Sequence, residues 1–309
     1  MRIVLAVSGV VTALIGLSGC VISTDIGPMD RFHTDFHYSY PVDAKARIDA
    51  ESFNGPIEIE GWDKNEVEIS GVKSASSEAA RDAIKIDVHN TPGSVAIRAI
   101  KPSSLNGNMG VKITMHVPRN AELDRIATSN GPIKIRDVSR AAHLKSSNGG
   151  ITITDVHGEV DAHTSNAPID ADSLDGPAVL KTSNGFVHAE NLTGSLEAET
   201  SNGAIQARMA SSTPSPIKLI TSNGSIELTM EKAPLGDIRA ETKNSAITLH
   251  LPADTAAKLT ADTSNASIES DFDVIGDKDK HHLSGAIGSG GHNIELNTAN
   301  GSIRIKKGI

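Results

Sequence analysis

The chain has one cysteine, few aromatic residues and no excess of positive charge, and each shortage excludes something. Cys20 is the only cysteine among 309 residues, so no disulfide can form within the chain. Aromatic residues make up only 3% of the chain, which predicts a narrow core filled by aliphatic side chains. The formal net charge of −9 argues against a nucleic-acid partner, because phosphate backbones are bound through Lys and Arg.

The sequence patterns of common catalytic sites are missing as well. The chain has no Gly-x-Ser-x-Gly nucleophile elbow, no His-Glu-x-x-His pair and no phosphate-binding loop. We therefore predict that the protein is not an enzyme and that it uses no cofactor. A polysaccharide-binding or polysaccharide-cleaving groove stays open as an alternative, although the outward positions of the repeats carry no recurring pair of carboxylates.

The first 20 residues resemble a bacterial lipoprotein signal. Arg2 precedes an apolar run over residues 3–15, and the sequence Leu17-Ser18-Gly19-Cys20 matches a lipobox. This resemblance implies that residues 1–19 are removed and that lipid on Cys20 anchors the chain to a membrane. The alternative is an ordinary secretory signal with a cysteine nearby by chance.

Residues 20–40 follow as a polar stretch without clear periodicity, and we predict a tether. His33, His37, Tyr38 and Tyr40 lie in this stretch, and their residue types also suggest a metal or aromatic site. A solvated linker is the simpler interpretation, because nothing in their spacing matches a known metal motif.

An N-terminal β cap is predicted over residues 41–125. The runs 66–69, 84–88, 94–100 and 111–118 alternate polar and apolar residues, as half-buried strands do, and a short helix is expected within 74–83. A solenoid leaves the backbone of its first rung unpaired, and an extra layer of strands protects that edge. We therefore expect these strands to cover the N-terminal end of the repeats.

The remainder of the chain, residues 126–309, repeats a short Thr-Ser-Asn-Gly pattern. The steps between its asparagines are 18 residues from Asn130 to Asn202, then 21 residues to Asn265, and a last step of 35 residues reaches Asn300. An isolated copy around Asn54 precedes them. The complete set is Asn54, Asn130, Asn148, Asn166, Asn184, Asn202, Asn223, Asn244, Asn265 and Asn300. A fixed period of about 20 residues is typical of a solenoid.

Two apolar pairs accompany nearly every asparagine. Apolar residues stand three and five positions after it, as in Ile151 and Ile153, and again six and four positions before the next one, as in Val160 and Ala162. The pattern predicts two inward-facing strands per rung in an all-β parallel solenoid. An antiparallel meander is the alternative. Thr or Ser two positions before every Asn favours the solenoid, because only stacked rungs require identity at equivalent positions.

We predict structural roles for this recurring corner. Asn tolerates the left-handed backbone region, and its amide can donate and accept along a ladder of stacked asparagines. Gly leaves room for the next rung, and the Thr or Ser hydroxyl can satisfy backbone groups that the sheets leave unpaired.

The long step between Asn265 and Asn300 contains an insertion, predicted to be a loop over residues 271–291. Its acidic and imidazole side chains are candidate ligands for a metal ion: Asp271, Asp273, Asp277, Asp279, His281 and His282. The spacing matches no known calcium loop, and Lys278 and Lys280 would oppose a cation. We therefore expect a solvated loop and no metal.

The lipobox, the strand that ends in Val117-Pro118-Arg119-Asn120 and the train of Asn-centred repeats resemble a bacterial family. It comprises cell-envelope proteins with a domain of unknown function, loosely described as adhesins. The resemblance covers residues 41 to 309 and implies a β-solenoid. It offers no catalytic motif to carry over.

These observations predict a lipid-anchored cell-envelope β-solenoid that acts as a non-catalytic scaffold or adhesin-like interaction surface. Val21 after the cysteine is not the Asp linked to inner-membrane retention, so we expect the outer membrane, with the face left open. The expected partners are the membrane, through the lipid, and an envelope protein or a glycan. The alternatives are a carbohydrate-binding or carbohydrate-processing protein and a component of envelope-stress regulation.

Overall fold

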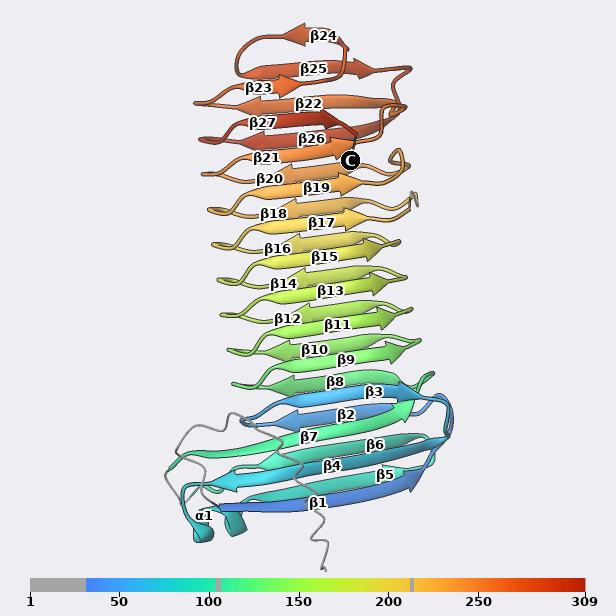
Figure 1. Cartoon of the computed structure of the whole chain (residues 1–309), viewed down its shortest axis with the longest axis vertical. Coiled ribbons are helices and arrows are strands. Elements are labelled where there is room, and N and C mark those ends of the chain that lie inside the picture. The colour runs from blue at the N-terminus through green and yellow to red at the C-terminus, as the bar shows by residue number, and fades with distance from the viewer. Residues whose placement is uncertain (1–31, 104–106, 212–213, 309) are drawn as a thin grey trace, which may run out of the picture.

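The strands of this protein stack one above another along its long axis (Figure 1). The computed structural model describes residues 32–103, 107–211 and 214–308. These residues form 27 strands and one short helix, α1 (Glu78–Ala83), and the strands make two sheets. None of the helical structure in these ranges is long and apolar enough to cross a membrane.

The first sheet has 13 strands, and we call it sheet A. Its spatial order is β1 (Phe32–Pro41), β4 (Glu66–Ala75), β7 (Met109–Pro118), β3 (Ile57–Trp62), β9 (Ile133–Val138), β11 (Ile151–Val156), β13 (Ile169–Leu174), β15 (Val187–Leu192), β17 (Ile205–Met209), β19 (Ile226–Met230), β21 (Ile247–Leu251), β27 (Ile303–Lys307) and β23 (Ile268–Ser270).

The second sheet, sheet B, has 14 strands. Its spatial order is β24 (Val274–Lys278), β25 (His282–Ile287), β22 (Ala257–Thr263), β26 (His292–Thr298), β20 (Ile238–Glu241), β18 (Ile217–Ile220), β16 (Leu196–Glu199), β14 (Ala178–Lys181), β12 (Val160–His163), β10 (Ala142–Ser146), β8 (Glu122–Thr128), β2 (Arg47–Ser52), β6 (Ser94–Ile100) and β5 (Lys85–Thr91).

Successive rungs pair in parallel, which confirms the solenoid and excludes the meander. Ile151 of β11 lies between Ile133 of β9 and Ile169 of β13, so equivalent positions of the 18-residue repeat stack directly. Sheet B repeats this register, with Val160 opposite Ala142 and Ala178. A chain that folds into stacked rungs buries each rung only against its neighbours.

The core lies between the two sheets and contains the apolar pairs expected from the sequence. Ile151, Ile153, Val160 and Ala162 are all fully buried. A third inward position per rung was not predicted. It holds Val138, Val156, Leu174, Leu192, Met209, Met230 and Leu251, each at most 2% exposed.

The residue before this third position explains why it was missed. In the 18-residue rungs, a left-handed residue bends the strand so that the next side chain turns inward. The four residues are Asp137, Asp155, Ser173 and Asn191, with φ between 52° and 60°. Asp, Asn and Ser dominate because short polar side chains tolerate this region best. The left-handed conformation was predicted at the ladder asparagines, but none of them has a positive φ. It occurs instead at the other end of the strand that follows each asparagine.

The N-terminal cap is present, and its strands extend both sheets. The strands β1, β4 and β7 pair antiparallel in sheet A, and β5 pairs antiparallel with β6 in sheet B. Two details differ from the expectation. The unit around Asn54, β2 and β3, is itself a parallel rung that pairs with β8 and β9. Residues 32–40 are not tether but belong to β1, because their alternating aromatic residues cover the end of the core.

The C-terminal rungs do not stack in sequence order. The last two strands, β26 and β27, lie between the rung β20–β21 and the rung β22–β23. After β21 the chain leaves one rung position unoccupied and forms the rung β22–β23 beyond it. It then returns, and β26 and β27 occupy the position between the two rungs. The predicted loop 271–291 is mostly strand instead: β24 and β25 form an antiparallel hairpin that pairs with β22 and covers this end.

Candidate functional site

A ladder of asparagine side chains runs along one edge of the molecule. In each rung from Asn148 onwards, the Asn side-chain amide nitrogen donates to the amide oxygen of the Asn on the neighbouring rung, at 2.6–2.8 Å. The spatial order is Asn130, Asn148, Asn166, Asn184, Asn202, Asn223, Asn244, Asn300 and Asn265. Asn54 is the exception, since it donates to the Met109 carbonyl at 2.8 Å. The ladder links rungs at a corner where the sheets end.

The hydroxyl two positions before each Asn fixes the same corner. Thr182 donates to the carbonyl of Ala167 at 3.0 Å and accepts from the amide of Gly185 at 3.2 Å. This satisfies backbone groups that no strand reaches. Equivalent bonds to the preceding rung come from Thr128, Ser146, Thr164, Thr200, Thr221, Thr242, Thr263 and Thr298.

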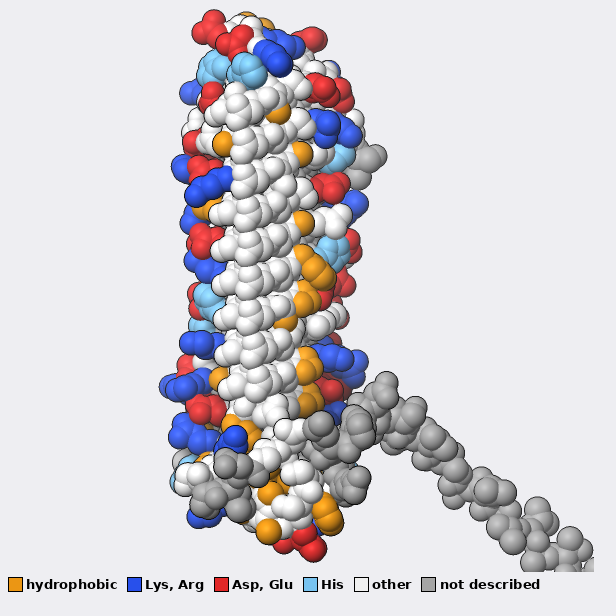
Figure 2. All heavy atoms as spheres, turned by 90° about the vertical axis from the view of Figure 1, so that its left-hand side faces the viewer, with side chains coloured by type: hydrophobic (Ala, Val, Ile, Leu, Met, Phe, Trp, Pro, Cys, Tyr) orange, Lys and Arg blue, Asp and Glu red, His pale blue; other side chains and the backbone are white. Residues whose placement is uncertain are grey.

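The ladder asparagines and the serines beside them form an uncharged surface. Six consecutive rungs from Asn130 to Asn223 carry Ser directly before the Asn, and most of these side chains are exposed. Figure 2 shows the result as a stripe free of charged side chains, with Lys, Arg, Asp, Glu and His gathered on both sides of it. The stripe is polar, but its amides already bond to one another.

The threaded C-terminal rung gives Asn300 two ladder neighbours and Asn265 one. Asn300 donates to Asn244 at 2.8 Å and accepts from Asn265 at 2.7 Å. We expect Asn300→Ala to lower the free energy of unfolding by about 1 kcal/mol and Asn265→Ala by about 0.5 kcal/mol, because exposed hydrogen bonds contribute at the low end. Urea unfolding of the two variants measures this. A larger loss for Asn265→Ala would contradict the threaded order.

The outer face of sheet B carries an ion-pair network in its middle rungs. Lys181 lies 2.7 Å from Glu197 and 3.3 Å from Glu199, and Lys218 lies 3.2 Å and 2.8 Å from the same two carboxylates. Hydrogen bonds from Lys181 and then Lys218 lower the pKa of Glu197 to about 2. Charges on neighbouring rungs therefore neutralise one another.

This network predicts a pH dependence. Since the folded-state pKa of Glu197 lies below its unfolded value, its contribution to stability is present above pH 4.5 and is lost as pH falls towards 2. The side chain is 33% exposed, so we expect Glu197→Gln to cost at most about 1 kcal/mol at pH 7. This difference should shrink as pH falls towards 2 and vanish below it. Glu269→Gln, whose partner Arg304 is 3.8 Å away, is the control and should change little at either pH.

A second charged group lies on the outer face of sheet B at the N-terminal end. Asp49 of β2 and Asp124 of β8 share Arg47, and with Glu51 and Arg98 they line a hollow of about 430 Å³. Burial, followed by the nearby Asp124 charge, raises the pKa of Asp49. Asp49 and Asp124 therefore form one charged cluster with Arg47. Sequence reasoning missed it because the two residues come from strands far apart in the chain.

The outer face of sheet A has its own hollow over the first rungs, of about 390 Å³. Glu60 pairs with Arg136 at 2.6 Å and lies 3.6 Å from His116. The ring of His116 stacks on Trp62, the only tryptophan, with centroids 5.1 Å apart. Lys64 lies 4.2 Å from the centroid of the same indole. These contacts satisfy the charges locally and leave a mixed polar surface.

The candidate metal ligands are held in other contacts. Asp279 accepts from the amides of His281 and His282 at 2.6 Å and 2.7 Å, which lowers its pKa. The His282 imidazole bonds to Asp262 at 2.6 Å, and this bond raises its pKa. In the parts of the chain that the structure describes, no group of three or more His, Cys, Asp or Glu side chains could hold a metal ion.

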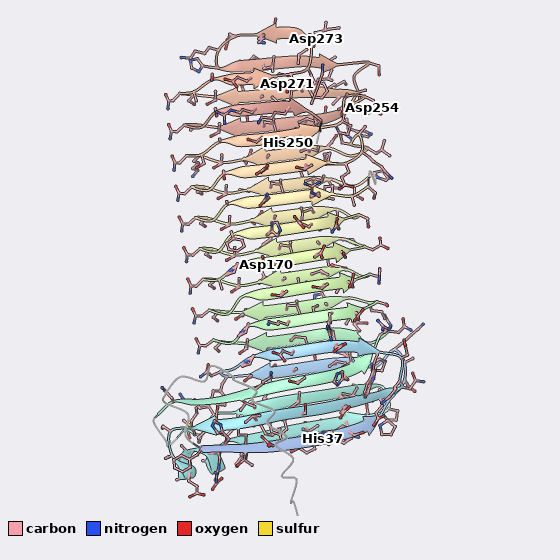
Figure 3. The ribbon with its side chains drawn as sticks, in the orientation of Figure 1. His37, Asp170, His250, Asp254, Asp271 and Asp273 are labelled. Atoms are coloured by element: carbon pink, nitrogen blue, oxygen red, sulfur yellow. The ribbon has the colours of Figure 1, made fainter. Side chains whose placement is uncertain are left out.

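The remaining predicted site residues lie apart from one another. Asp271 and Asp273 lie at the β24 end of the molecule, whereas His37 lies on β1 at the opposite end (Figure 3). The carboxylate of Asp271 accepts from the backbone of Lys307 at 3.2 Å, and Asp277 lies in β24. Cys20 is outside the described residues. The structure thus unites the asparagines but separates the acidic residues of the insertion from the histidines of β1.

The fold and the corner ladder define a repeat protein of the parallel β-solenoid class. A family model matches residues 44–306, and the chain belongs to that family, Toastrack DUF4097. A comparison with curated proteins gave no match.

Three solved bacterial structures are similar to the chain at low identity. One is a putative cell adhesion protein from Clostridium sporogenes, with 12% identity over 89% of this chain and 100% of that one, and a TM-score of 0.22. A putative adhesin from Bacteroides fragilis has 15% identity over 89% and 97%, with a TM-score of 0.28. A putative lipid binding protein from Parabacteroides distasonis has 13% identity over 88% and 96%, with a TM-score of 0.26. Likeness at this level identifies neither a ligand nor a partner.

Proposed function

We propose that the protein is a lipid-anchored scaffold of the bacterial cell envelope that presents a non-catalytic, adhesin-like interaction surface. The observation that carries this proposal is the unbroken stack of parallel rungs, reinforced along its edge by the asparagine ladder. Each rung is hydrogen-bonded to the next through both sheets and through the corner. Such a rod holds its two ends at a fixed separation.

The lipobox fits one end of this rod. Cys20 lies 12 positions before Phe32, where β1 begins at the capped N-terminal end. In the proposed arrangement that end faces the membrane, and the β24–β25 hairpin points away from it. The 13 strands of sheet A separate the two ends by roughly 60 Å at the usual strand spacing. Val21 after the cysteine favours the outer membrane.

The variable outer faces are the proposed contact surface. The inward and corner positions repeat because packing requires it, whereas the outward positions change charge from rung to rung. Cross-rung pairs such as Lys181 with Glu197 leave these faces without a strong field of one sign. A mixed polar surface of this kind fits a protein or glycan partner better than a polyanion.

Lipid anchoring is tested by changing the cysteine. We expect Cys20→Ala to abolish labelling by a fatty-acid analogue and to move the protein from the membrane fraction to the soluble fraction, because no other residue offers the thiol. Ser23→Ala is the matched control and should keep both properties. Membrane fractionation on a density gradient separates inner from outer membrane. Undiminished labelling of the Cys20→Ala variant would refute the anchor.

The interaction role is tested separately. The protein is used as bait with intact cells and with envelope extracts, and bound proteins and glycans are identified. We expect an envelope protein or glycan whose capture is lost when outward residues of one face are changed, for instance Glu197 and Lys218 to Ala. Release of reducing sugar from an envelope polysaccharide would instead support the carbohydrate-processing alternative and overturn the non-catalytic role.

A further inference from the structure

Strand β1 is an open edge of sheet A. Within the described ranges it is the outermost strand, paired on one side with β4 over all ten of its residues. No further strand of the described ranges pairs with its other side, and the short helix α1 contacts the strand. An extended edge of this length readily pairs with another chain unless the sequence opposes it.

The other outermost strands are short or carry opposite charges, whereas β1 is long, nearly uncharged and in contact with the six-residue helix α1. In sheet A the opposite edge strand, β23, has only three residues. In sheet B the edge strand β24 carries Asp277 and Lys278, and β5 carries Lys85 and Asp87. Charged residues and short length are the usual means by which proteins prevent edge pairing. The sequence of β1 has no Lys or Arg and a single carboxylate, Asp35.

Half of the aromatic residues of the chain lie in this one strand. The chain contains five Phe, two Tyr and one Trp, and β1 holds Phe32, Phe36, Tyr38 and Tyr40. Phe36 and Tyr38 are 5.9 Å apart between ring centroids, and Tyr38 and Tyr40 are 6.3 Å apart. Phe32 is 37% exposed. Aromatic side chains concentrated at an exposed edge are typical of a protein interface.

We infer that β1 pairs antiparallel with β1 of a second copy of this chain, about a two-fold axis that passes Phe36. In that register Phe36 faces Phe36 of the second copy, Phe32 faces its Tyr40, and Thr34 faces its Tyr38. All of these belong to the face of β1 whose aromatic residues pack against the core. Cross-strand aromatic pairs of this kind stabilise a sheet. Sheet A then continues from one copy into the other.

The opposite face of β1 selects the same register. Asp35 lies opposite His37 of the second copy, so a carboxylate meets an imidazole twice by symmetry, and His33 meets Ser39. If the axis passes Asp35 instead, Asp35 lies opposite Asp35, and if it passes His37, His37 lies opposite His37. Either shift removes the two pairs between Asp35 and His37. Like charges directly opposite each other are unfavourable in a sheet, so a register that places Asp35 opposite Asp35 is disfavoured. An isologous two-fold contact is also the commonest way in which identical chains associate.

Single cysteines introduced into β1 test the register. With Cys20→Ser the chain has no other thiol, and Phe36→Cys should form a disulfide-linked dimer under mild oxidation, because the opposed Cα atoms lie about 5 Å apart. Thr34→Cys and Tyr38→Cys should stay monomeric in a denaturing gel when oxidised alone, since each lies about 13 Å from its own copy. Mixed together, these two variants should cross-link.

If Phe36→Cys does not fold, cross-linking between Thr34→Cys and Tyr38→Cys still tests the register. Cross-linking of all three variants alone would indicate random collision and overturn the register, and absence of any cross-link would overturn the dimer.

The association itself is measured by sedimentation of the Cys20→Ser protein, for which we expect twice the mass of one chain. Asp35→Lys should weaken the dimer about tenfold, because it places a positive charge opposite His37 twice. Asp277→Lys, which changes another exposed carboxylate on β24 at the other end, should leave the dimer intact. A monomer at every concentration, or equal weakening by both changes, would contradict the inference. Since Cys20 is absent from these variants, the result is independent of the lipid anchor.

Discussion

Gly185→Ala is expected to lower the free energy of unfolding by about 3 kcal/mol or more, at the upper end for overpacking. A Cβ atom at Gly185 would lie 1.8 Å from the carbonyl oxygen of Ala167 on the neighbouring rung. That oxygen belongs to the backbone, and it already accepts from Thr182 at 3.0 Å. Neither rung can move aside without breaking the bonds that hold the corner.

The same close approach occurs at several corners, so the effect should recur there, although Ala167, Ser245 and Ala266 hold the equivalent position in three other rungs. The distance from an added Cβ to the carbonyl oxygen of the neighbouring rung is 1.7–1.8 Å at Gly131, Gly149, Gly203, Gly224 and Gly301. Gly93→Ala is the matched control, because nothing lies within 4 Å of its Cβ position. The free energies of unfolding of the two variants are compared by urea or thermal unfolding. Equal stability of Gly185→Ala and Gly93→Ala would show that the stacked rungs leave room for a methyl group at the corner.

Deleting residues 292–309 is expected to unfold the C-terminal end over at least two rungs. This segment contains β26 and β27, which lie inside the stack. Without them β23 loses its pairing with β27, and β22 keeps only its antiparallel pairing with β25. Because each rung is stable only on its neighbours, β22 to β25 should become unprotected.

Hydrogen exchange measures this result directly. We expect rapid exchange of the β22–β25 amides in the shortened chain and unchanged protection of β9 to β19. A solenoid stacked in sequence order would lose only its last rung, so protected β22 and β23 amides would show either that order or a β22–β23 rung that restacks on β20 and β21. The Ile303→Ala substitution should destabilise the same end of the molecule less than the deletion. Ile303 is fully buried, so its truncation should lower the free energy of unfolding by about 2–4 kcal/mol.

Most of the solenoid was predictable because its packing requirements are local. Inward residues must alternate along each strand, and the corner needs a hydroxyl, an amide and a small residue at fixed offsets. These requirements recur in every rung, so they produce a repeating pattern of fixed period in the sequence. The N-terminal cap was predictable for a related reason, as an exposed first rung needs cover.

The candidate sites were predicted less well than the fold. The Asn ladder forms as expected, but Asn54 bonds to Met109 instead of joining it. The hollow at Asp49 and Asp124 joins strands 75 positions apart in the chain, and no repeat signals it. The left-handed conformation was predicted at the ladder asparagines and lies instead at residues such as Asp155, because Asp, Asn and Ser all tolerate it and residue type alone does not say which of them adopts it.

The sequence by itself determined the rung: its two strands, its inward side chains, its corner and its signal-like start. Only the tertiary structure decided the order of the rungs. Residues equivalent to Ile247 stand at the same offset in every repeat, so the strand after β21 could be β23 or β27 with almost the same local contacts. The outcome depends on the connection, since the β24–β25 hairpin carries the chain back and leaves β26–β27 the gap to fill. The order of the asparagine ladder reflects this arrangement, because Asn300 lies between Asn244 and Asn265.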